Sequence, residues 1–102
     1  MTAYKVKRFV HLGINPRGIL PIGTHATVEK YLDTAASDWY RYAAQNYVLW
    51  TNADVLALAR GVTSLPGMSN FYVFVTEFSH AAANGMMARE FWDWFNRSRS
   101  QY

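Results

Sequence analysis

The sequence FYVFVTEF, residues Phe71–Phe78, decides the fold class of this chain. Aromatic and β-branched residues fill it, and both kinds are enriched in β-strands. Apolar side chains occupy both sets of alternating positions, which predicts a central strand, or an edge strand that another element covers. One predicted face carries Phe71, Val73 and Val75, and the other carries Tyr72, Phe74 and Phe78.

Upstream of this strand, the sequence predicts a hairpin followed by a helix. Two β-rich runs, residues 39–44 and 47–51, flank a pair of residues at 45–46 that suits a tight turn. Asn52 is the expected N-cap of the helix, and Asp54 falls in the first turn, where the helix dipole favours an anion. The apolar stripe of this helix consists of Val55, Leu58, Ala59 and Val62.

The N-terminal third predicts a strand, a long loop and a helix. Residues 4–14 follow a period of two, which Arg8 and Phe9 break in opposite senses. The strand therefore either contains a bulge or places Phe9 on an open sheet face. Prolines and glycines make residues 15–24 a loop. Thr24 is the expected cap of a helix that extends to about Ala36.

A last helix is predicted from about Met87 to Asn96, and the short basic tail after it, residues 97–102, is expected to fray. The predicted order is β-α-β-β-α-β plus a C-terminal helix, in one domain over residues 1–102. This is the order of the ferredoxin-like fold, an α+β architecture with an antiparallel sheet and two helices on one face. The other face must then be solvated, dimerised or bound to a ligand.

Composition supports a folded chain with a large aromatic surface. Apolar residues make up 51% and charged residues 17% of the sequence, which excludes intrinsic disorder. Aromatic residues account for another 17%. Because a domain this small leaves much of its surface exposed, part of the aromatic surface is expected to be covered by a partner, most simply a second copy in a homodimer.

Several chemistries are excluded by the residue types present. The chain has no cysteine, so disulfides, thiolate metal sites and cysteine nucleophiles are absent. The absence of cysteine also fits a cytoplasmic protein, which we expect. The apolar runs are shorter than the ~18 residues of a membrane helix, so we expect no membrane contact. His11, His25 and His80 lack neighbours at metal-ligand or triad spacing. We therefore expect no metal, no cofactor and no catalytic residue.

Candidate binding residues are basic and aromatic. The formal net charge is +3, and the basic residues gather near the two termini, where they would form a patch for a few phosphate contacts if the ends meet. Glu77, which interrupts an apolar strand, is expected to face solvent or to pair with Arg8 or Lys7. The candidates for binding nucleic acid or a partner are Lys5, Lys7, Arg8, Phe9, Tyr40, Tyr42, Trp50, Arg97 and Arg99.

Four segments carry a resemblance to a known group: YVLWT at 47–51, FYVFVTE at 71–77, Gly85, and EFWDWF at 90–95. Together they resemble small, uncharacterised bacterial and phage proteins with a ferredoxin-like fold. That group is distantly similar to the small CRISPR-associated dimeric nuclease-like family. The resemblance implies an Asp at the end of the first strand as the nuclease metal ligand, but residues 11–15 read HLGIN and contain no acid.

The sequence thus favours a non-enzymatic, homodimeric binding protein whose partner is a protein or a nucleic acid. Two enzymatic alternatives stay open. One is a dimeric α+β barrel of the oxygenase type, with a pocket lined by Trp50, His80 and Asn15. The other is a degenerate metal-dependent nuclease, for which Glu77 is the residue to mutate.

Overall fold

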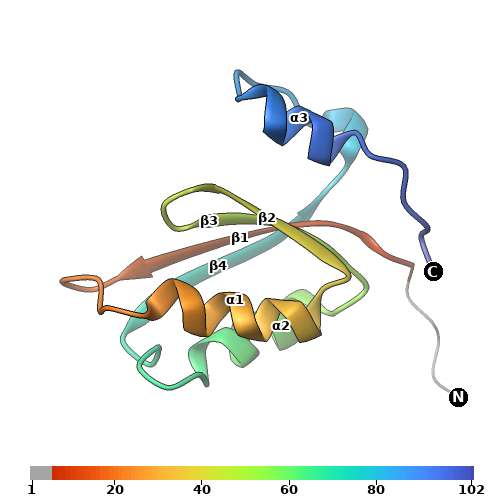
Figure 1. Ribbon diagram of the computed structural model, residues 1–102. Coiled ribbons are helices and arrows are strands. Elements are labelled where there is room, and N and C mark those ends of the chain that lie inside the picture. Colours follow the sequence, from red (N-terminus) through yellow and green to blue (C-terminus); the bar gives the residue numbers. More distant parts are fainter. Residues whose placement is uncertain (1–5) are drawn as a thin grey trace, which may run out of the picture.

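The computed structural model describes residues 6–102 as a four-stranded antiparallel sheet covered by helices on both faces (Figure 1). The strand order is β2-β3-β1-β4, and α1 and α2 lie on one face while α3 lies on the other. The elements, in chain order, are β1 (Arg8–Pro16), α1 (Thr24–Ala35), β2 (Asp38–Ala43), β3 (Asn46–Thr51), α2 (Val55–Thr63), β4 (Phe71–Phe78), the short 3-10 helix η1 (His80–Ala82) and α3 (Arg89–Phe95).

The first core lies between the sheet and the two crossover helices. Strand side chains that alternate along β1 meet the apolar stripes of α1 and α2, as the period-two and helical patterns predicted. Val28 and Leu32 of α1 and Leu58 and Val62 of α2 are fully buried there. From the sheet, this core receives Val10, Leu12, Ile14, Tyr47, Leu49 and Phe71.

The second core lies on the opposite face and is almost entirely aromatic. Three residues of α3, Phe91, Trp94 and Phe95, pack onto Phe9 and Val48 of the two central strands. Phe9 is only 6% exposed, and its ring centroid lies 4.6 Å from that of Phe95. The expectation that Phe9 faces an open sheet or marks a bulge is therefore wrong. The pairing of β1 is regular, and the chain's own C-terminal helix covers the residue.

Phe71–Phe78 is a strand with the predicted bounds, but it lies at the edge of the sheet. Of the described strands, only β1 pairs with it. On the face toward α2, Phe71 is buried and the two valines of β4 are partly buried, whereas the opposite face is covered only at Phe78, where α3 packs. Tyr72 and Phe74 stay exposed on the part of that face beyond α3.

The helix caps differ from those expected. Asp54, not Asn52, caps α2, because its carboxylate accepts hydrogen bonds from the backbone N–H groups of Leu56 and Ala57 at 3.1 and 3.3 Å. Gly23 precedes α1 in a left-handed conformation with φ 87°, which favours glycine. Thr24 instead donates its hydroxyl hydrogen to the Pro21 carbonyl.

Candidate functional site

The two ends of the described chain lie side by side. The backbone N–H of Lys7 donates to the Gln101 carbonyl at 2.6 Å, and the indole N–H of Trp50 donates to the Ser100 carbonyl at 3.1 Å. The tail 97–102 therefore does not fray as expected but runs past the start of β1 (Figure 1). The sequence could not show this, because both hydrogen bonds join residues far apart in the chain.

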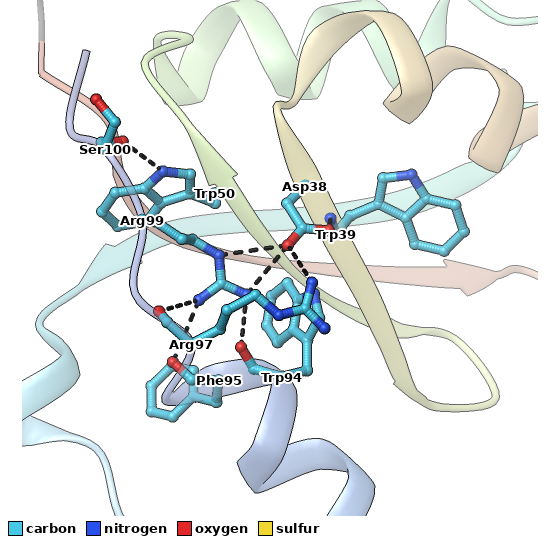
Figure 2. Close-up of polar contacts among 8 residues, drawn as sticks. All are labelled: Asp38, Trp39, Trp50, Trp94, Phe95, Arg97, Arg99 and Ser100. Carbon is cyan, nitrogen blue, oxygen red and sulfur yellow. Dashed lines mark hydrogen bonds and ion pairs between the residues drawn. The ribbon is translucent and has the colours of Figure 1, made fainter.

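Arg99 fixes the tail to the sheet (Figure 2). Its side chain is 8% exposed and donates to the Asp38 carboxylate at 3.1 Å and to the Trp94 carbonyl at 2.5 Å. The guanidinium carbon also lies 4.4 Å from the Trp94 ring centroid, which adds a cation–π contact. Further hydrogen bonds reach the carbonyls of Phe95 and Arg97. Arg99, predicted as a binding residue, is thus occupied in holding α3 and the tail on β2.

Between the two ends of the chain runs an open groove of about 1270 Å³, here called the terminal groove. Its aromatic part comes from the second core, and its rim combines charged and ring-bearing side chains. Lys7 and Arg97 lie on this rim, and the Arg97 side chain is 60% exposed. The imidazole of His80 stacks on Phe95, with ring centroids 4.4 Å apart. The groove is lined by residues 7–9, Trp50, 77–81, 95–97 and 99–102.

Arg8 and Glu77 form an ion pair at the edge of the terminal groove. The Arg8 Nε donates to the Glu77 carboxylate at 2.7 Å, and its Nη1 donates to the Thr51 and Ala53 carbonyls at 3.0 and 2.6 Å. The Glu77 side chain is 63% exposed. Both outcomes considered for Glu77 therefore hold together, since it faces solvent and pairs with Arg8. Arg8 itself serves the fold.

The other predicted binding residues separate into different places. Phe9 is buried under α3, and the rings of Tyr40 and Tyr42 lie against Phe91, at centroid distances of 5.8 and 6.0 Å. Phe9 is therefore covered by the chain itself, and Tyr40 and Tyr42 are partly covered by it. Trp50 borders the terminal groove. Lys5 lies outside the described residues.

A second surface lies on the same face of the sheet as α3, in the part that this helix does not cover. The sequence did not identify it as a binding surface. This open half-sheet consists of His11, Gly13, Asn15, Asn46, Tyr72 and Phe74. Tyr72 and Phe74 are 59% and 67% exposed, and the Arg17 guanidinium lies 4.2 Å from the Tyr72 ring centroid. The alternation of residues in β4 already placed Tyr72 and Phe74 on one face of the strand. It could not show which part of that face α3 covers.

The residues expected for an enzyme pocket are not brought together. Trp50 and His80 line the terminal groove, whereas Asn15 lies on the open half-sheet. His80 shares a hydrogen bond of 2.8 Å with the Asn96 side chain. Over residues 6–102, no three His, Cys, Asp or Glu side chains are grouped closely enough to hold a metal ion.

Comparison with protein-family models, curated proteins and solved structures finds no match to this chain. Among the described helices, none has both the length and the apolar character needed to cross a bilayer.

Proposed function

We propose that this chain is a non-enzymatic binding module that takes up single-stranded nucleic acid along the terminal groove. The observation that carries the proposal is the meeting of the two chain ends, which places Lys7 and Arg97 on one rim. Exposed rings stand beside these cations, namely the imidazole of His80 and the phenol of Tyr102. Cations along a groove with rings for base stacking are what single-strand binding requires.

The proposal is limited to few phosphate contacts. Arg8 and Arg99 are held by short hydrogen bonds to carboxylates and backbone carbonyls. Arg97 lies farther from a carboxylate, 3.8 Å from that of Asp38, and its side chain is 60% exposed, so Lys7 and Arg97 are counted as phosphate partners. Each phosphate neutralised on a single strand contributes about −0.7 to the slope of log affinity against log salt concentration. For two phosphate contacts, a slope of about −1.4 is therefore expected.

The test measures fluorescence anisotropy of a labelled oligonucleotide at several salt concentrations. Lys7→Ala and Arg97→Ala are each expected to make this slope shallower by about 0.7, because each removes one phosphate contact. Lys30→Ala and Arg60→Ala are the matched controls, because both side chains are exposed on the helices of the opposite face. Binding that does not vary with salt, or an equal loss in all four variants, contradicts the proposal.

The architecture that we propose for this module is ferredoxin-like. Support comes from the order β2-β3-β1-β4 in an antiparallel sheet, with α1 and α2 together on one face. The additional α3 on the other face is what distinguishes this chain from an open sheet.

A second function, self-association into a homodimer, is favoured by β4. This edge strand has eight residues and carries neither the proline nor the lysine with which proteins protect exposed edges. The exposed rings of Tyr72 and Phe74 lie on the same strand. A second copy would cover both by pairing along β4.

Light scattering of the purified chain tests the dimer. A mass of twice that of the chain is expected, and Phe74→Lys is expected to convert it to a monomer because the ring would leave the interface. Ile19→Lys is the control, since Ile19 is also exposed but lies in the loop before α1. A wild-type monomer at all concentrations contradicts self-association and leaves nucleic-acid binding to its own test.

A further inference from the structure

A pocket of about 220 Å³ lies between α3, the segment before it, and the sheet. It shares Phe78 and Phe95 with the lining of the terminal groove, but its other lining residues differ. Aromatic and apolar side chains dominate its walls, as in most small-molecule sites. It is lined by His11, Tyr42, Val48, Phe78, 83–85, Met87, Phe91, Trp92 and Phe95.

The polar side chains in the lining are those of His11, Tyr42 and Asn84. The Asn84 Oδ1 accepts from the backbone N–H of Gly85 at 2.8 Å, whereas His11 and Tyr42 form a pair on the sheet. The Nε2 atom of His11 and the hydroxyl oxygen of Tyr42 are 2.7 Å apart. Burial lowers the pKa of His11 and raises the pKa of Tyr42, so both groups are held in their neutral forms near pH 7. In either tautomer of His11, the Tyr42 hydroxyl keeps one hydrogen-bonding function beyond the pair.

The described lining contains no Lys, Arg, Asp or Glu side chain. An ion that entered would lose its hydration without gaining a countercharge, which is costly. The occupant must therefore be uncharged. Its size is also limited, because an apolar cavity of about 150 Å³ holds a benzene molecule, whereas drug-sized ligands fill about 300 Å³ or more.

We propose that this pocket, here called the α3 pocket, binds a small uncharged aromatic molecule that carries one polar group, of the phenol or indole class. The ring packs among Phe91, Trp92 and Met87, and the polar group bonds to the hydroxyl of Tyr42. The site is independent of nucleic-acid binding, since none of the cations assigned to that function line it.

Fluorine NMR with the full chain tests the site, with para-fluorophenol as the probe. A saturable shift is expected. Fluorobenzene, which lacks the hydroxyl, should bind about fivefold more weakly, the worth of one hydrogen bond. Tyr42→Phe should weaken the binding of para-fluorophenol by the same factor and leave the binding of fluorobenzene unchanged. Tyr40→Phe is the matched control, because Tyr40 lies on the same strand and packs on Phe91 but does not line the pocket.

The charge and the place of the ligand are tested separately. Para-fluorobenzoate, which is similar in size but anionic, should not bind. Ala83→Leu fills the pocket and should abolish binding while the circular dichroism spectrum stays that of the wild type. The proposal is overturned by equal binding of the benzoate, by unchanged binding to a folded Ala83→Leu variant, or by the absence of saturation with para-fluorophenol.

Discussion

Individual cations in this protein have different roles, which their number alone does not show. Arg99 is nearly buried and bonds to one carboxylate and several carbonyls, whereas Arg89 is 92% exposed and lies 3.9 Å from Asp93. An exposed ion pair of this kind contributes little, because water and salt screen it. A buried cation that donates hydrogen bonds to carbonyl oxygens is costly to remove, because those buried oxygens then lose a donor.

Arg99→Ala is therefore expected to lower the free energy of unfolding by about 2–4 kcal/mol, since Asp38 and the carbonyls of Trp94 and Phe95 each lose a donor and the cation–π contact with Trp94 is lost. Urea unfolding followed by tryptophan fluorescence measures this. Arg89→Ala is the control and should change stability by less than about 0.5 kcal/mol. Equal effects of the two substitutions would show that Arg99 does not hold the tail.

At the scale of the element, α2 shows how a helix start is decided among neighbouring candidates. Asn52 and Asp54 are both good N-cap residues, and they are separated by a single position. The structure selects Asp54, whose carboxylate reaches the N–H groups of Leu56 and Ala57. The helix therefore starts at Val55.

Asp54→Ala should destabilise the protein by about 1 kcal/mol because two N–H groups lose their acceptor. Asn52→Ala, at an exposed position outside the cap, should have almost no effect. Thermal unfolding of the two variants side by side measures the difference. A larger loss for Asn52→Ala would place the cap where the sequence first suggested it.

At the scale of the whole molecule, α3 does much of what sequence reasoning assigned to a second molecule. The aromatic excess of the sequence is real, but Phe9, Phe78 and much of Tyr40 and Tyr42 pack against this seven-residue helix. The large aromatic side chains that stay exposed in the described part of the chain are fewer, namely Tyr72 and Phe74 on β4 and Tyr102 in the tail. The aromatic surface of the sheet that is open to a second copy is therefore limited to an edge strand and does not extend over a whole sheet face.

Phe95→Ala should remove about 3 kcal/mol or more of stability, because the ring contacts Phe9, Phe78 and Phe91 at centroid distances of 4.6, 6.1 and 5.4 Å. It should also increase the fluorescence of an apolar-binding dye, since the aromatic face of the sheet opens. Phe74→Ala, on the exposed part of β4, should leave both readings near the wild type. Dye binding that is the same in the two variants would contradict a closed second core.

The sequence by itself determined most of the elements and the two faces of each. The periods of β1 and β4 separated Val10 from Phe9 and Val73 from Phe74, because side-chain direction follows directly from position along a strand. The apolar faces of α1 and α2 followed in the same way from residues three or four positions apart. These features need only the chemistry of residues a few positions apart.

Only the tertiary structure decided what each face meets. The period of β4 is the same whether α3, a second copy or solvent lies against it, so the edge position of β4 and the cover over Phe9 could not be read locally. The same holds for Arg99 with Asp38 and for Lys7 with Gln101, which lie far apart in the chain. Periodicity records which side of an element is apolar, and only the packing of the whole chain determines which atoms cover it.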